Sequence, residues 1–186
     1  EKTSSSLNPE YCVKFKVGQE DNEAITTVTD VVWSASKHGL LKPVVHIEPV
    51  ELVGVTISKT SGFNAKYIRD NNIGVGAVIK ITRSGDVIPF IKEVVLGVLS
   101  AIPRYEDHGG FKWNDNEVEF VLTNKNVKAV KMQRLISFFK SMMVEFLGKA
   151  SIEKLYDAGY ETIEDVIKVP LNIMRNIIGR ANGEKA

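Results

Sequence analysis

The sequence predicts an α+β protein in which a small closed β-barrel precedes an all-α domain. The first part of the chain consists of short β-rich segments broken by Gly, Pro and Asn, and the last part repeats apolar residues at helical spacing. The change between the two patterns falls near Pro103. With 186 residues, the chain is long enough for one domain or two small ones.

Several of the β-rich segments alternate apolar and polar residues, which is typical of half-buried strands. The predicted strands are residues 12–17, 26–34, 44–47, 50–58, 78–82 and 87–98. A short helix is expected over Asn64–Asp70, because two Asn residues and two Gly residues mark its exit. Five or six short strands with one short helix between them favour a closed barrel, of which the five-stranded oligonucleotide-binding (OB) barrel is the commonest at this length.

From Val130 onward the apolar period is helical, and Met132, Leu135 and Phe139 fall on one face. Further helices are expected over Ser151–Ala158, which Gly159 ends, from the near capping box Thr162-Ile-Glu-Asp165, and over Leu171–Ile178 after Pro170. Residues 104–122 form the least regular stretch and the expected junction between the two domains.

The charge is nearly balanced, with 24 basic and 23 acidic residues. The net charge of +1 argues against a uniformly polyanion-binding protein. The segment Thr123–Val144 is nevertheless basic throughout and contains no acid; its basic residues are Lys125, Lys128, Lys131, Arg134 and Lys140. This stretch is either a solvated helix face or a contact for nucleic acid or phosphate.

Composition also limits the compartment and the metal chemistry. No apolar run is long enough to span a membrane, so no membrane partner is expected. One Cys excludes an internal disulfide, and Cys12 with the scattered residues His38, His46 and His108 is a poor set of zinc ligands. We therefore expect a reducing, cytoplasmic location and no metal site. The chain starts at Glu1 rather than Met, which indicates a piece of a longer protein.

Two motifs indicate phosphate binding. Leu147-Gly148-Lys149-Ala150-Ser151 has the small residues that let a backbone approach a phosphate, directly before a helix whose N-terminal N–H groups attract anions. This pattern suggests a helix-hairpin-helix unit, and 181–186 looks like the start of a second one; the alternative is that Gly148 is only a helix cap. In Arg83–Pro89, Gly85 and Asp86 predict a tight turn, and Arg83 is a candidate binding residue at a strand end.

The stretch from Gly39 to Pro89 resembles the OB-fold domain of bacterial-type NAD-dependent DNA ligases. Three segments carry the resemblance in the family's order. They are Gly39-Leu-Leu-Lys-Pro43-Val-Val-His-Ile-Glu48-Pro49-Val50, Gly54-Val-Thr-Ile-Ser-Lys-Thr-Ser-Gly-Phe-Asn64 and the intact Arg83-Ser-Gly-Asp86-Val-Ile-Pro89. The resemblance covers most of the chain from about residue 11.

The resemblance implies four parts. Residues 1–21 would end the adenylation (nucleotidyltransferase) domain, 22–103 would form the OB domain, 104–129 a connector in place of the family's zinc finger, and 130–186 a truncated helix-hairpin-helix domain. Val13-Lys14-Phe15 is similar to the last motif of the adenylation domain, which implies that Lys14 is catalytic and contacts the nucleotide phosphate.

Three departures from the family pattern affect this interpretation. Residues 100–128 contain no Cys, so no zinc is expected, and the loss suggests a compact phage or viral member. The family's Arg-Thr-Gly becomes Lys37-His38-Gly39, in which Lys binds phosphate without the planar fork of Arg. The Lys-x-Asp-Gly nucleophile motif is absent from these 186 residues, so the chain is not expected to ligate alone.

By the resemblance, the whole enzyme joins DNA nicks through a lysyl-AMP and a DNA-adenylate, using NAD and Mg²⁺ bound mainly outside this chain. Its partners would be nicked double-stranded DNA and an adenylation domain in the same or another chain. The expected DNA-binding residues are Lys37, Arg83, Asp86, Lys131, Arg134, Gly148, Lys149 and Ala150. Two alternatives stay open: a stand-alone, non-catalytic OB and helix-hairpin-helix DNA-binding module, and an OB barrel that recruits a protein.

Overall fold

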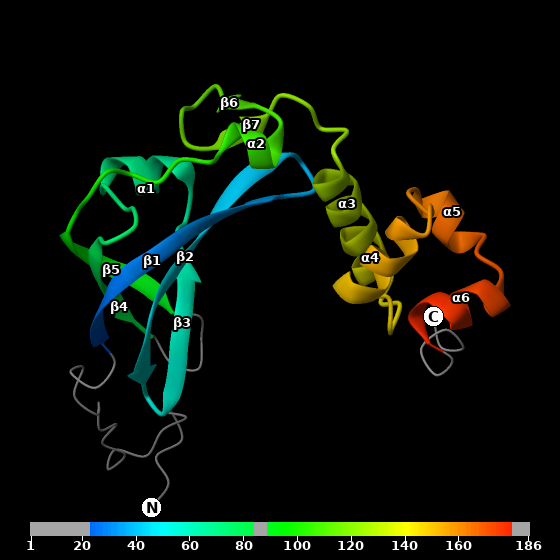
Figure 1. Ribbon diagram of the computed structural model, residues 1–186, viewed down its shortest axis with the longest axis horizontal. Helices are drawn as coiled ribbons and strands as arrows, with labels where there is room; N and C mark the ends of the chain where they lie inside the picture. The colour runs from blue at the N-terminus through cyan, green and yellow to red at the C-terminus, as the bar shows by residue number, and fades with distance from the viewer. Residues whose placement is uncertain (1–22, 84–88, 180–186) are drawn as a thin grey trace, which may run out of the picture.

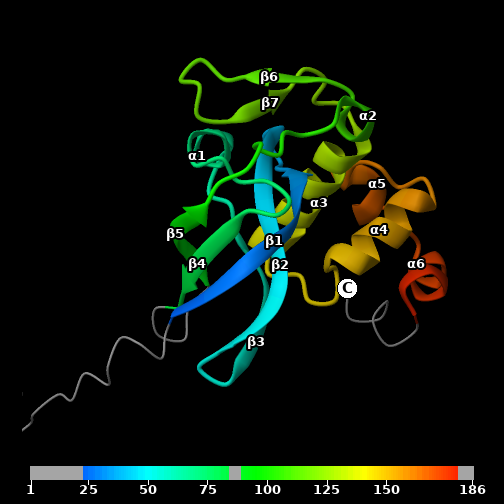
Figure 2. The ribbon, with the colours of Figure 1, turned by 60° about the vertical axis from the view of Figure 1, so that its left-hand side comes forward.

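A computed structural model describes residues 23–83 and 89–179. Its barrel strands lie on one side and helices α3–α6 on the other, and a hairpin lies above the barrel (Figures 1 and 2). Five strands close the barrel: β1 (Glu23–Ala35), β2 (Leu40–Leu52), β3 (Val55–Ser61), β4 (Val78–Thr82) and β5 (Phe90–Leu96). They pair in the cyclic order β1-β4-β5-β3-β2, and β2 pairs again with β1. This ring is OB-like, as the sequence predicts.

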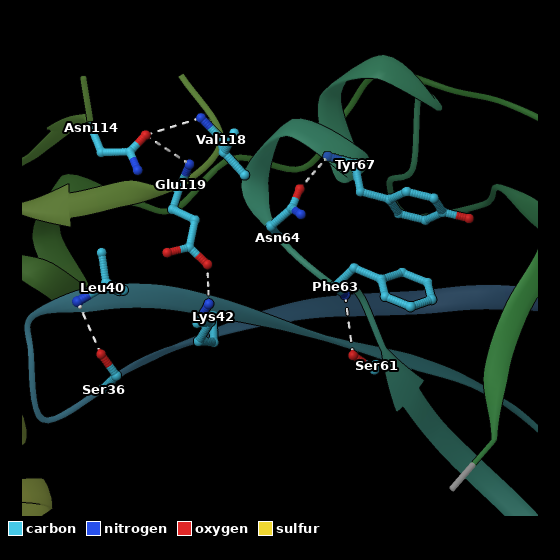
Figure 3. Close-up of polar contacts among 10 residues, drawn as sticks. All are labelled: Ser36, Leu40, Lys42, Ser61, Phe63, Asn64, Tyr67, Asn114, Val118 and Glu119. Carbon is cyan, nitrogen blue, oxygen red and sulfur yellow. Dashed lines mark hydrogen bonds and ion pairs between the residues drawn. The ribbon is translucent and has the colours of Figure 1, made fainter. Parts of the chain in front are cut away.

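The short helix α1 (Ala65–Asp70) connects β3 to β4. It begins where the sequence predicts, because the Asn64 side chain accepts a hydrogen bond of 2.8 Å from the backbone N–H of Tyr67 (Figure 3). Its buried residues Ala65 and Ile68 join the apolar core of the barrel.

The predicted strand 50–58 is wrong, because the chain reverses within it. Val53 and Gly54 both have positive φ, 52° and 70°, which is the conformation of a two-residue hairpin turn between β2 and β3. The predicted break at Pro49 is wrong as well, since β2 runs through it. The register of β2 against β3 shifts between His46 and Val50, which is the kind of irregularity that accommodates proline in a strand.

Residues 104–122, expected to be the least regular stretch, contain ordered elements. They form α2 (Tyr105–His108) and the antiparallel hairpin β6 (Phe111–Trp113) and β7 (Phe120–Leu122). β7 pairs with the start of β2, and Lys42 of β2 forms an ion pair with Glu119 (Figure 3). Asn114 orders the hairpin loop by accepting hydrogen bonds from the N–H groups of Val118 and Glu119. The connector therefore continues the barrel sheet.

The helical part consists of α3 (Lys128–Ser141), α4 (Lys149–Asp157), α5 (Ile163–Ile167) and α6 (Leu171–Ile178). The predicted helix from Val130 starts two residues earlier and ends at Ser141, because positive φ values at Met143 and Phe146 break the helical path. The expected helix over 151–158 spans Lys149–Asp157 instead, and α6 has the predicted bounds.

Two apolar clusters hold the fold together. The first fills the barrel and extends through Phe111, Phe120 and Leu122 to Val130, and the second joins residues of α3–α6 from Met132 to Ile178. The domain boundaries proposed from the sequence stay predictions. Within the described residues, no helix is long and apolar enough to cross a bilayer, and no group of three His, Cys, Asp or Glu side chains could hold a metal ion.

Candidate nucleic-acid interface

The β1–β2 turn presents Lys37 and His38 on a loop with a fixed shape. The backbone N–H groups of Ser36 and Gly39 donate to the carbonyls of Leu40 and Ser36, at 2.8 and 2.9 Å. The Leu40 N–H donates to the Ser36 hydroxyl at 3.1 Å, as Figure 3 shows. These hydrogen bonds fix the conformation of the β1–β2 turn in the absence of a ligand.

Helix α3 meets this loop through two hydrogen bonds. The Lys37 Nζ donates to the Ser137 Oγ at 3.0 Å, and the Arg134 Nε donates to the Lys37 carbonyl at 3.2 Å. Lys37 and Arg134, which are 97 residues apart in sequence, thus lie side by side where the barrel meets the helical part. Both side chains are exposed, so they can exchange these partners for a stronger acceptor such as a phosphate.

A groove of about 630 Å³ runs along this contact. We call it the junction groove and define it by its lining residues: Lys37, His38, Lys125, Arg134, Ser137, Phe138, Ser141 and Ile163. It brings together two lysines, an arginine, a histidine and two hydroxyls from separate segments, and no described acidic side chain lines it. Cations with hydroxyl donors and no acid are the groups that bind a phosphate backbone.

Gly39 gives Lys125 its place in the groove. Gly39 has φ of 80°, and a Cβ built there would stand only 3.0 Å from the Lys125 Cγ. A larger residue would be strained by this φ and would also displace the lysine. The glycine therefore lets the Lys125 stem lie against the loop, and Lys125 lines the groove.

Of the residues that line the groove, sequence reasoning predicted only Lys37 and Arg134 as binding residues; Lys125 and His38 are the two cationic or titratable members that it missed. The sequence identified Lys125 as part of the acid-free basic stretch. Its position in the sequence did not predict that it lies beside the β1–β2 turn. His38 was considered only as a poor zinc ligand, although its position between Lys37 and Gly39 was a usable signal.

The start of α4 is open to an anion. Gly148 is its N-cap, no side chain caps the helix, and the first turn contains no acid. Helix α5 offers the contrast, because Thr162 and Asp165 form the predicted capping box and hydrogen bonds from Thr162 lower the pKa of the Asp165 carboxyl. In α4 no side chain caps the first-turn N–H groups, which include those of Lys149 and Ala150.

Lys131 forms an ion pair with an acid, whereas Arg134 donates to a backbone carbonyl. Its Nζ donates to Glu161 at 2.8 Å, and this hydrogen bond lowers the pKa of the Glu161 carboxyl. Lys128 similarly pairs with Asp157. Two cations of the acid-free stretch are therefore paired with acids at the end of α4 and just after it, which sequence proximity alone could not indicate.

Arg83 lies far from the junction groove. It follows β4, whose last residue Thr82 is paired with Glu23 at the start of β1, whereas Lys37 follows the end of β1. At about 3.3 Å per residue, β1 spans roughly 40 Å of chain between them. Lys14 and Asp86 lie outside the described residues, so their predicted roles stay predictions.

A closed five-stranded barrel with one helix between its third and fourth strands places this protein in the OB-fold class. Residues 25–100 match the family of NAD-dependent DNA ligase OB-fold domains, and this part of the chain belongs to that family.

Similar proteins include viral and bacterial DNA ligases. The chain is 39% identical over 160 residues to the putative DNA ligase 052L of Invertebrate iridescent virus 3, covering 86% of this chain and 20% of the viral protein. It is 38% identical over 167 residues to the DNA ligase of Acanthamoeba polyphaga mimivirus, with 88% and 25% covered. It is 30% identical over 196 residues to the DNA ligase of Sulfurihydrogenibium azorense, with 98% and 27% covered. The chain thus spans about a fifth to a quarter of the length of these relatives.

Proposed function

We propose that this chain is the part of an NAD-dependent DNA ligase that clamps nicked duplex DNA, and that α3–α6 act as a helix-hairpin-helix domain. The junction groove is the observation that carries the proposal, because it combines phosphate-binding side chains from the barrel loop, the connector and α3. Such a groove binds backbone phosphates irrespective of base sequence, as nick recognition requires.

The extent of the similarity supports the helical part of the proposal. The alignment with the viral ligase covers 160 residues, whereas residues 25–100 number only 76, so similarity to ligases extends well beyond the OB domain. The open start of α4 supplies a second phosphate site, at which the N–H groups of Lys149 and Ala150 would face a backbone phosphate.

In the proposed mechanism this chain contributes positioning and charge neutralisation, which dominate phosphoryl transfer. Lys37, Arg134 and the start of α4 hold one side of the duplex, and Arg83 after β4 holds another point, with Asp86 in the predicted role of fixing the turn. Lys14 contacts the nucleotide phosphate. NAD would supply the adenylyl group, and both NAD and Mg²⁺ would bind mainly to the part of the enzyme outside these 186 residues.

A stand-alone binding module is the competing proposal. A nick-sealing assay in which this chain is combined with an adenylation domain that carries Lys-x-Asp-Gly distinguishes the ligase role from the binding module. Nick sealing that depends on both components supports the ligase role, whereas tight DNA binding with no gain in sealing would favour the module.

Substitution of Gly148 tests whether the N-terminus of α4 binds a DNA phosphate. A Cβ at Gly148 meets nothing within 4 Å, so Gly148→Asp should fold, and by capping α4 it should raise stability by a few tenths of a kcal/mol. Because the carboxylate occupies the N–H groups and repels phosphate, affinity for nicked duplex should fall about tenfold. Fluorescence anisotropy of labelled DNA measures the affinity, and thermal unfolding measures the stability.

Gly148→Asn is the matched control, because it caps the helix without a charge. We expect it to bind DNA more tightly than the Asp variant and less tightly than the wild type. Wild-type affinity in both variants, together with their higher stability, would show that Gly148 is only a helix cap.

A further inference from the structure

An aromatic cavity of about 520 Å³ lies between β1, α1 and the β6–β7 hairpin. We call it the aromatic cavity; the residues that matter here are Trp33, Arg69, Tyr105, Phe111, Trp113 and Phe120. It shares no lining residue with the junction groove. Its volume lies within the range of cavities that hold small organic molecules.

The aromatic rings offer flat surfaces for stacking. Tyr105 stacks on Phe111 with ring centroids 4.7 Å apart, yet Tyr105 is 65% exposed. Trp113 packs on Phe120 at 4.2 Å, and Phe120 itself is buried. The inner rings therefore hold the wall in place, while the exposed Tyr105 ring remains able to contact a planar ligand.

The charges at the cavity favour an anionic ligand. The Arg69 guanidinium lies 4.8 Å from the centroid of the Trp113 ring, while its Nε donates to Asp70. Lys112 also lines the cavity and has no ion-pair partner among the described residues. No described acidic side chain lines the cavity. The buried indole N–H of Trp33 has no hydrogen-bond partner in the described part of the chain, which leaves one donor unsatisfied at the cavity wall.

The cavity lies close to the DNA site proposed above. Trp33 precedes Lys37 by four residues, a separation that spans at most about 14 Å even in a fully extended chain. A nucleotide in the aromatic cavity can therefore belong to the DNA whose phosphates lie in the junction groove.

We propose that the aromatic cavity binds an unpaired nucleotide of that DNA. Its base stacks on the exposed Tyr105 ring, and its phosphate lies against Lys112 and Arg69. An apolar peptide would match the rings, but it would leave Lys112, which has no ion-pair partner among the described residues, without an anion. The inference rests on the proposed DNA-binding function and adds a second, base-dependent contact to it.

The two Trp residues of the chain, Trp33 and Trp113, both line the cavity, so intrinsic tryptophan fluorescence reports on it directly. Three DNA probes separate the possibilities: a blunt duplex, the same duplex with a short unpaired overhang, and that overhang made of abasic nucleotides. The two overhangs carry the same phosphates and differ only in the bases.

We expect all three probes to bind, and only the overhang with bases to give saturable quenching and about tenfold tighter binding. Tyr105→Leu, at an exposed side chain, should remove this gain and leave the blunt duplex unaffected. Phe63→Leu is the matched control, because Phe63 is also exposed and packs on Tyr67 outside the cavity.

Binding of the blunt duplex with no difference between the two overhangs would overturn this inference and leave the proposed function intact. Failure of every probe to bind would instead overturn the DNA-binding function. Quenching by an apolar peptide but by no overhang would identify the cavity as a protein-docking site and would also refute the proposal.

Discussion

The double variant Lys37→Ala/Arg134→Ala is expected to bind nicked duplex about a hundredfold more weakly at low salt, which is roughly tenfold per lost phosphate contact. The two side chains lie together in the junction groove, where no described acid offsets their charge. Each phosphate contact releases counterions, so the slope of log affinity against log salt should become shallower by about two. Affinities measured at several salt concentrations give both quantities.

Lys66→Ala/Lys80→Ala is the matched control, because it removes the same net charge from α1 and β4, outside the groove. It should leave the salt dependence nearly unchanged. An equal effect of both double variants would mean that overall charge, rather than the junction groove, controls binding. An unchanged slope in the groove variant would remove the groove from the DNA site.

The second large effect concerns stability. Phe120→Ala should lower the free energy of unfolding by about 3–5 kcal/mol, with a fall in Tm of roughly 10 °C. Phe120 is 6% exposed, and its ring contacts Trp33, Phe111 and Trp113 at centroid distances of 5.6, 4.8 and 4.2 Å. Its removal empties the centre of the cluster that ties the hairpin to the barrel. Thermal and denaturant unfolding measure the loss.

Tyr105→Ala serves as the control within the same cluster, because its ring is mostly exposed and, among the described residues, stacks on Phe111 alone. Its expected cost is about 1 kcal/mol. Similar losses in the two variants would show that Phe120 has no central role.

The aromatic cluster around Phe120 also concerns the question of whether the connector needs zinc for stability. Residues 104–129 contain no Cys and one His, a donor set that does not fit a zinc finger. We propose that packing of aromatic rings stabilises the connector in place of the zinc finger that the family resemblance implies. A strong chelator should therefore leave the unfolding midpoint unchanged, and a lowered midpoint would contradict this role.

The features that the sequence predicted well are local. Asn64 caps α1, Thr162 and Asp165 form their capping box, and Gly159 adopts φ of 98° after α4. In each case the determining hydrogen bonds or backbone angles lie within a few residues of one another. The alternation of apolar residues likewise predicted a barrel, since each strand exposes one face to a shared core.

The features that the sequence could not predict depend on distant contacts. β6 and β7 have three residues each, and they are strands because β7 pairs with β2 and because Phe111 and Phe120 join the barrel core. The turn at Val53 was hidden because a β-branched residue is unusual at positive φ.

The candidate site was also only partly predictable, because it depends on contacts between residues that are far apart in the sequence. Lys37 and Arg134 were each predicted to bind DNA, but only folding shows that they share one groove with Lys125 and His38. Lys131 was predicted on the same grounds as Arg134, yet its ammonium is engaged by Glu161. A charge pattern identifies cations, whereas the partners that neutralise them depend on how the helices pack.

Site-specific cross-linking tests most directly whether nicked DNA lies in the junction groove. Ser141→Cys in a Cys12→Ser background places the only thiol of the chain at the groove, and a disulfide can then form with a thiol tethered to a phosphate near the nick. We predict efficient cross-linking at Ser141→Cys and little at Lys66→Cys on α1 in the same background. Equal or preferred cross-linking at residue 66 would contradict the proposed path of the DNA.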